Sequence, residues 1–191
     1  MMVWGLLKRK KAESTIRKKA VAHNQPVRPK DWDSIQTIML VGSIEHIEQL
    51  DQVLRLVSDI EQENKQVTAI IYLTDSKKQT PTVDMPVHIH LCQKKDFSML
   101  SIPKSTSLTD VLQQPCDWLL DLNFSEITQV FSLSVLSQAG FKSGPDTPLN
   151  EHLHLSIDFS SQSDTHDLYK SGHGIIAELK KLHFDTTKQG A

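Results

Sequence analysis

From residue 35 onward the sequence alternates between two patterns. One is a short apolar run, typical of a strand, and the other is a longer segment with one apolar face, typical of a helix. Residues 35–42 (IQTIMLVG) contain four consecutive apolar residues before a glycine, a pattern typical of a strand buried on both faces. In the following segment apolar residues return at steps of three or four, which predicts an amphipathic α-helix. These residues are Ile47, Leu50, Leu54, Val57 and Ile60.

The same alternation continues to the end of the chain. Further strands are expected at residues 66–75, 87–92, 116–123 and 152–159, with a very short one within 141–148, and helices at residues 107–113, 124–140 and 165–183. Such alternation predicts an α/β fold with a doubly wound, mostly parallel sheet and helices on both faces, Rossmann-like in type. The regular apolar/polar alternation of residues 152–159 predicts an edge strand near the C-terminus. We expect a single α/β domain over residues 31–191.

The first thirty residues differ from the rest in charge. They hold nine lysines and arginines against one acid, Glu13, for a net charge of +8. Because the whole chain has a net charge of −2, the remaining residues carry −10. We interpret residues 1–30 as a basic N-terminal extension of helix-forming composition, docking at most through its first turn, and ended by Pro26 and Pro29.

Four interpretations of this extension remain open. Trp4 and Leu7 precede its charges, so it could rest on an anionic membrane surface or meet a protein partner. It could equally contact phosphate backbones, or be a solubilising or disordered tail. The acidic charge of residues 31–191 argues against nucleic-acid binding by the domain itself.

Composition points to a cytoplasmic protein. No run of 18 apolar residues is present, so no transmembrane segment is expected, and the short apolar N-terminus lacks the features of an export signal. Cys92 and Cys116 stand alone, with no CxxC pair, and are interpreted as reduced thiols.

A candidate ligand site follows from the predicted sheet. Ligands of such sheets bind beyond the carboxyl ends of the strands, where the strand order reverses. If the first and fourth strands are neighbours, Gly42 and Ser43 would face Asp121 and Asn123 there, and Lys142 would add positive charge. Unpaired N–H groups at the two following helix N-termini could receive a phosphate or carboxylate.

Ordinary helix capping is the competing explanation of the same residues. Ser43 is a plausible N-cap, and Asn123 with Glu126 has the spacing of a capping box. Asp121 is not needed as a cap, so its role stays unexplained.

Motifs for cofactors or catalysis are missing. The segment VGSIEH has one glycine, not the three of a dinucleotide fingerprint, and lacks the P-loop lysine. Two His-x-His pairs, 88/90 and 152/154, could ligate zinc, but no third ligand stands at a recognisable spacing and the strands would lie at opposite edges. Neither cysteine has a basic neighbour that would activate it. We therefore expect no cofactor, no metal and no assigned catalytic residue, and the chain is less suggestive of an enzyme than of a binding protein.

One stretch resembles a known family. The segments DWLLDLN, SQAG and FKSG resemble a D-x-L-I-x-L-N … S-x-A-x-x-K-x-G pattern found in small uncharacterised proteins, mainly of Bacteroidetes. The matching residues are Asp117, Leu119, Leu120, Leu122, Asn123, Ser137, Ala139, Lys142 and Gly144. The likeness extends over most of the chain and implies no particular activity. A fainter likeness links this region to the acceptor half of heptosyltransferase-type glycosyltransferases, which need a second, donor-binding domain.

Two functions are therefore expected from the sequence. The preferred one is a non-enzymatic cytosolic binding or scaffold protein that uses the basic extension or a sheet edge. The alternative is a ligand-binding protein or enzyme acting on a phosphorylated or anionic small molecule at Gly42, Ser43, Asp121, Asn123 and Lys142.

Overall fold

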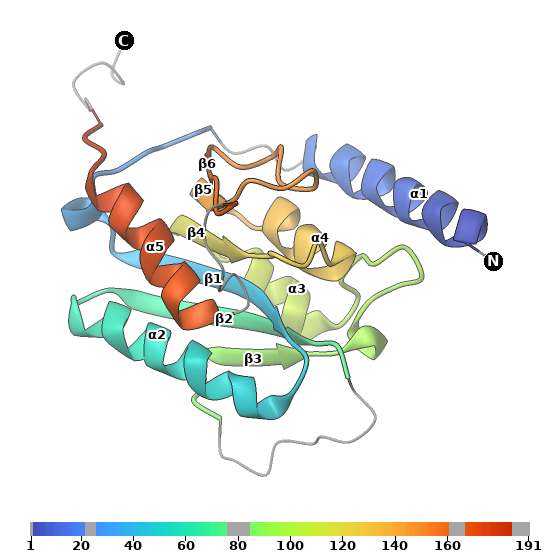
Figure 1. Cartoon of the computed structure of the whole chain (residues 1–191), viewed down its shortest axis with the longest axis horizontal. Coiled ribbons are helices and arrows are strands. Elements are labelled where there is room, and N and C mark those ends of the chain that lie inside the picture. The colour runs from blue at the N-terminus through green and yellow to red at the C-terminus, as the bar shows by residue number, and fades with distance from the viewer. Residues whose placement is uncertain (1, 22–25, 76–84, 161–166, 185–191) are drawn as a thin grey trace.

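The computed structural model describes residues 2–21, 26–75, 85–160 and 167–184, with the side chains of residues 2–6 and 21 left aside. A six-stranded parallel sheet has the order β3-β2-β1-β4-β5-β6, the doubly wound arrangement expected (Figure 1). The strands are β1 Thr37–Ile44, β2 Gln66–Leu73, β3 Ile89–Cys92, β4 Cys116–Leu122, β5 Ala139–Pro145 and β6 Leu155–Ile157. Since β1 and β4 are neighbours, the strand order reverses between them, and β6 is the expected edge strand near the C-terminus.

Helices cover both faces of this sheet. They are α1 Met2–Val21, α2 Leu50–Gln62, α3 Thr106–Leu112, α4 Thr128–Leu136 and α5 Leu168–Lys180. Helices α2 and α5 pack on one face, and α3 and α4 on the other, each with its own apolar cluster (Figure 1). Short 3₁₀ turns stand at Trp32–Ser34, Ile47–Gln49 and Lys94–Asp96. The α/β architecture and the two-sided cover predicted from the sequence are confirmed.

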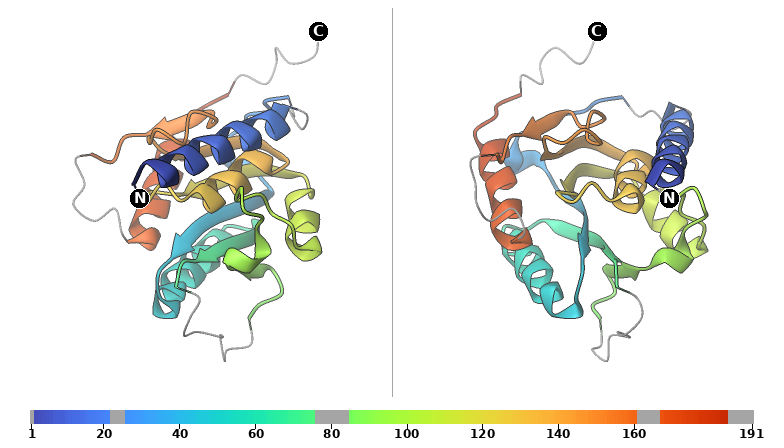
Figure 2. Two further views of the ribbon diagram at one scale, coloured as in Figure 1. Left: turned by 90° about the vertical axis from the view of Figure 1, so that its right-hand side faces the viewer. Right: turned by 45° about the vertical axis from the view of Figure 1, so that its right-hand side comes forward.

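Helix α1 lies outside α4 as an additional layer (Figure 2). Ile16 is fully buried there in a small cluster with Phe131, Val135 and Leu149. This contact comes from the middle of α1, so the expectation of docking through the first turn alone is wrong. Within the described residues no helix is long and apolar enough to cross a membrane.

Polar contacts hold α1 in the same place. Arg9 Nη2 donates to Glu126 at 2.7 Å, and its Nε donates to Glu13 at 2.8 Å. The Arg17 guanidinium lies 5.3 Å from the centre of the Phe131 ring and pairs with Glu151. Both arginines of α1 are therefore engaged with the body or with α1 itself.

Several predicted element ends are wrong, among them those of β1 and α4. β1 continues through Gly42 and Ser43, because these residues pair with Ile71 and Tyr72 of β2. α4 ends at Leu136 rather than at residue 140 as expected, and Gly140 lies inside β5.

Helix α5 has two glycines that weaken its helical propensity. A Cβ on Gly172 would lie 2.4 Å from Leu56 Cδ2 of α2. This glycine therefore allows α5 and α2 to approach closely.

Candidate functional site

A crevice is present at the carboxyl ends of β1 and β4, where the doubly wound sheet predicts one. Its volume is about 360 Å³. Leu122, Phe124, Ile127 and Leu168 supply the apolar part of the lining, and Glu45 is its charged residue. The polar residues of the lining are Ser43, Gln49 and Ser125. Of the five residues expected at the site, only Ser43 lines it.

In the first loop of the crevice, which follows β1, the backbone N–H groups already have hydrogen-bond partners. Gln49 Oε1 accepts hydrogen bonds from the N–H groups of Glu45, at 2.7 Å, and His46, at 3.0 Å. Ser43 is not the N-cap expected from the sequence, since it lies in β1 and the chain passes through a 3₁₀ turn before α2 begins. Together with the Glu45 carboxylate, this arrangement is poorly suited to an anion.

The second loop, residues 123–127, is closed by Asn123. Its Oδ1 accepts from Ile127 N at 2.8 Å, and its Nδ2 donates to Ile127 O at 3.1 Å. Glu126 instead has a left-handed backbone (φ 51°) and pairs with Arg9 of α1. The predicted capping box is therefore wrong, although Asn123 still shapes the approach to α4.

Asp121 is fully buried beneath this loop and does not reach the crevice lining. Its Oδ1 accepts from Asn123 N at 2.7 Å, whereas Oδ2 has no hydrogen-bond partner of good geometry among the described residues. Burial raises the pKa of Asp121 to about 7, opposed in part by the nearby Ser134 hydroxyl, by the Asn123 N–H and by Lys142. Asp121 is thus a core carboxyl group with one unsatisfied oxygen.

The neighbouring hydrogen bonds suit a protonated Asp121. His152 Nδ1 lies 3.3 Å from Leu149 O, which can only accept, so the proton sits on Nδ1. Burial lowers the pKa of His152 to about 3, so its ring is neutral and Nε2 accepts from Ser134 Oγ at 2.7 Å. The Ser134 hydroxyl, which lies beside Asp121, then has only lone pairs to offer, and a neutral carboxyl group can donate to them.

Lys142 extends from β5 beneath the C-terminus of α4. Its Nζ donates to the carbonyls of Ser134 at 2.7 Å, Val135 at 3.1 Å and Ser137 at 3.2 Å. Burial lowers the pKa of Lys142 to about 8, with Asp121 and Cys116 opposing the shift. A cation at the negative end of a helix stabilises that end, so Lys142 acts as the C-terminal cap of α4. We call Asp121, Ser134, Lys142 and His152 the buried polar cluster.

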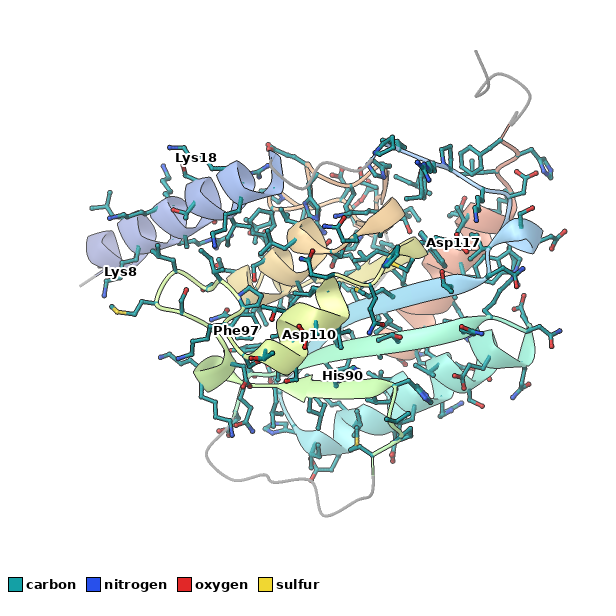
Figure 3. All side chains as sticks on the ribbon, turned by 180° about the vertical axis from the view of Figure 1, so that it is seen from behind. Lys8, Lys18, His90, Phe97, Asp110 and Asp117 are labelled. Carbon is teal, nitrogen blue, oxygen red and sulfur yellow. The ribbon has the colours of Figure 1, made fainter. Side chains whose placement is uncertain are left out.

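The remaining polar motif residues also have local partners. Asp117 accepts from the N–H groups of Gln36 and Thr37 and pairs with Lys30, which ties the start of β4 to β1 (Figure 3). A Cβ on Gly144 would lie 2.8 Å from Asp121 Cβ. The motif therefore joins β1, β4, α4 and β5, and Gly42 likewise packs tightly, since its Cβ would meet Leu122 at 3.3 Å.

The histidine pairs and cysteines show no metal or nucleophile site. His88 and His90 lie at β3 and His152 and His154 beside β6, at opposite edges of the sheet as expected. No group of three potential metal ligands occurs within the described residues. Burial raises the pKa of Cys116 to about 12 and that of Cys92 further, so both thiols stay protonated at neutral pH.

A second candidate surface lies on the outward side of α1. Lys10, Lys11 and Lys18 are exposed and make no ion pair within the described residues. Lys18 stands at the outer edge of the molecule, away from the sheet (Figure 3). We call these three residues the outer lysines. The charge count predicted a basic extension, but only the burial of Ile16 shows that the body holds it as a docked helix.

Comparisons with known proteins give little functional information. No curated protein matches the chain significantly. Among solved structures, a glycosyl transferase of family 9 from Veillonella parvula is similar, with a TM-score of 0.48 and 11% identity. The match covers 82% of this chain and 43% of the other, so the chain spans less than half of that protein. A likeness at this level carries nothing about activity.

The family comparison covers most of the chain. Residues 8–171 match the family of unknown function DUF6913, a stretch that runs from α1 into α5. It includes the whole D-x-L-I-x-L-N … S-x-A-x-x-K-x-G pattern, in agreement with the expected resemblance to an uncharacterised family. The chain therefore belongs to the DUF6913 family.

Proposed function

We propose that this chain is a non-enzymatic cytosolic binding protein that uses the outward face of α1 to contact an acidic partner. The observation that carries the proposal is the docking of α1: Ile16 is fully buried against α4, whereas the outer lysines on the opposite side are exposed. A docked helix presents its charges in a fixed array, and less conformational entropy is lost on binding than with a disordered tail.

The distribution of partners along α1 supports this role. Arg9 and Arg17 are occupied by Glu126 and Glu151 of the body. The outer lysines have no such partner within the described residues, although the rest of the chain is acidic. The arginines of α1 therefore hold the helix on the body, whereas the outer lysines are open to an acidic surface.

The sheet edges, the other surface considered for a partner, are less suitable. β3 has four residues and β6 has three, so each edge offers few unpaired backbone groups. Short edge strands are a common means of avoiding strand addition. We therefore assign the contact to α1.

A second candidate is ligand binding at the crevice, which its volume of about 360 Å³ favours. The lining combines Phe124 and Leu122 with the Glu45 carboxylate, and the N–H groups of the first loop are bonded to Gln49. A neutral or cationic ligand with an apolar part fits these groups better than the anionic ligand expected from the sequence.

The proposal can be tested with heparin as a generic polyanion. Titration of the full chain with fluorescent heparin should show binding that weakens as salt increases, because such contacts release counterions. The variant Lys11→Gln/Lys18→Gln should bind on the order of tenfold more weakly.

A matched control is available on the far side of the sheet. Lys170 and Lys181 are exposed on or directly after α5, and Lys170→Gln/Lys181→Gln removes the same charge. Unchanged binding by this variant supports the assignment. An equal loss of heparin binding in both variants would show a general charge effect and would overturn the assignment to α1. Ligand binding at the crevice would instead be favoured if a neutral or cationic metabolite stabilised the chain and Phe124→Ser abolished that stabilisation.

A further inference from the structure

We propose that the acidic partner of α1 is an anionic lipid surface, on which α1 lies flat while Leu7 and Met99 enter the headgroup region. This inference rests on the proposed function and names the class of partner. It uses exposed apolar side chains that a purely electrostatic contact would not need.

The outward stripe of α1 is the first observation. Leu7, Lys11, Ser14 and Lys18 follow at steps of four, three and four, so they lie along one side of the helix, and all four are exposed. Leu7 is 61% exposed. Ala12 and Ile16, which are buried, lie on the opposite side, so the stripe faces away from the body.

A tight loop beside α1 supplies a second apolar side chain. Met99 is 93% exposed at the tip of residues 98–102. Ser98 N donates to Ile102 O at 2.8 Å, and Ser98 Oγ accepts from the N–H groups of Leu100 and Ile102. The loop is thus closed by its own hydrogen bonds, which hold Met99 outward.

The same loop packs against the apolar cluster between α1 and α4. Ile102 packs against the cluster that contains Ile16. The segment between β3 and α3, which includes this loop, runs beside α1 on the side away from α2 and α5 (Figures 1 and 2). The loop that carries Met99 therefore lies beside the helix that carries Leu7 and the outer lysines.

The chemistry of this region favours lipid over nucleic acid. Exposed Leu and Met gain free energy by entering the interface of a bilayer, and lysines beside them attract anionic headgroups. Among the described side chains of α1 and of residues 97–104, no exposed aromatic ring is available for stacking on a base, since Phe97 is buried. The two arginines, which read phosphate and base edges best, are turned to Glu126 and Glu151.

Vesicle co-sedimentation tests the inference with the full chain. Binding is measured to vesicles of phosphatidylcholine alone and to vesicles mixed with phosphatidylserine. We expect binding only to the anionic vesicles, and on the order of tenfold weaker binding by Lys11→Gln/Lys18→Gln but not by Lys170→Gln/Lys181→Gln.

A second variant separates lipid insertion from charge attraction. Leu7→Ser/Met99→Ser keeps every charge, so it should bind heparin as the wild type does and bind anionic vesicles several-fold more weakly. Circular dichroism melting of each variant checks that the fold is retained.

The outcomes keep the two proposals distinct. Heparin binding that depends on Lys11 and Lys18, with no binding to anionic vesicles, leaves the proposed function standing and overturns the lipid assignment. Vesicle binding that is unaffected by Leu7→Ser/Met99→Ser also overturns it. Tighter binding to duplex RNA than to anionic vesicles, at equal salt, would assign the surface to nucleic acid instead.

Discussion

The buried polar cluster and the outer lysines are both charged regions, but they differ in how their charges are satisfied. Lys142 is 8% exposed and donates to three carbonyls at the end of α4. The outer lysines are exposed and make no ion pair within the described residues. The first region stabilises the fold, and the second is available to a partner.

This difference changes the meaning of the sequence motif. Asp117, Asn123, Lys142 and Gly144 stand out in the sequence as polar or small residues of one motif. Asn123 and Lys142 were expected near the carboxyl ends of the strands, where ligands are usually found. In the structure each of them contacts a neighbouring element of the same domain. The motif therefore describes how β4, α4 and β5 are joined, and it gives no direct indication of a reaction.

The largest effect is expected from removing the Lys142 ammonium. In Lys142→Met the apolar stem is kept, while the carbonyls of Ser134, Val135 and Ser137 lose the ammonium as a donor. The Ser134 carbonyl keeps its hydrogen bond from the Ser137 hydroxyl at 2.8 Å. We expect a loss of about 3–5 kcal/mol in the free energy of unfolding, measured by urea denaturation. Lys181→Met, at an exposed position, serves as the control; an equal loss there would refute the capping role.

Asp121→Asn should change the dependence of stability on pH. The folded-state pKa of about 7 lies above the ordinary 3.8, so the folded protein holds this proton more tightly than the unfolded chain. The stabilisation is complete below pH 3.8 and is lost as the pH rises toward 7. Asn does not titrate, so the stability of the variant relative to the wild type should rise by roughly 3–4 kcal/mol across this range. Parallel curves for the two proteins would contradict the protonated state.

Gly144→Ala should have a moderate effect. The added Cβ would lie 2.8 Å from both Asp121 Cβ and Asp121 O, which are packed in the core. We expect a cost of about 1–3 kcal/mol by thermal or urea unfolding. Gly174→Ala, whose Cβ would meet only the Phe159 ring at 3.2 Å, is the milder comparison.

The sequence predicted the architecture well because strand and helix periodicity reflect burial directly. The alternation of apolar strands and amphipathic helices along the chain was enough to predict a two-sided, mostly parallel sheet. The position of β1 beside β4 was assumed from the usual doubly wound arrangement, and the structure has it. The site was harder to predict, since Ser43 and Asn123 have the same residue types whether they cap a helix or meet a ligand. Lys142 was expected at the ligand site, and its role as the cap of α4 could not be predicted, because its partners are backbone carbonyls that no sequence pattern marks.

The docking of α1 was also hidden in the sequence. Ala12 and Ile16 are single apolar positions among lysines and arginines, so no continuous apolar stripe is visible. Phe131 and Val135 explain the contact: α4 is buried on all sides, which requires a helix outside it. A helix such as α4, with apolar residues or serines on every side from Val130 to Leu136, is therefore a signal that could have predicted the additional layer.

The smallest effect on stability is expected at the outer lysines. Lys11→Gln/Lys18→Gln should change the free energy of unfolding by no more than about 0.5 kcal/mol, because both side chains are exposed and unpaired within the described residues. The same variant should lose heparin binding. A large loss of stability would show that these lysines stabilise the fold, as the buried polar cluster does.

Lysine acylation followed by mass spectrometry tests the central claim most directly, since it reports which lysines a partner covers. With anionic vesicles or heparin present, Lys10, Lys11 and Lys18 should lose reactivity, while Lys170 and Lys181 on the far side should keep it. Protection of Lys170 and Lys181 with the outer lysines still reactive would contradict the account.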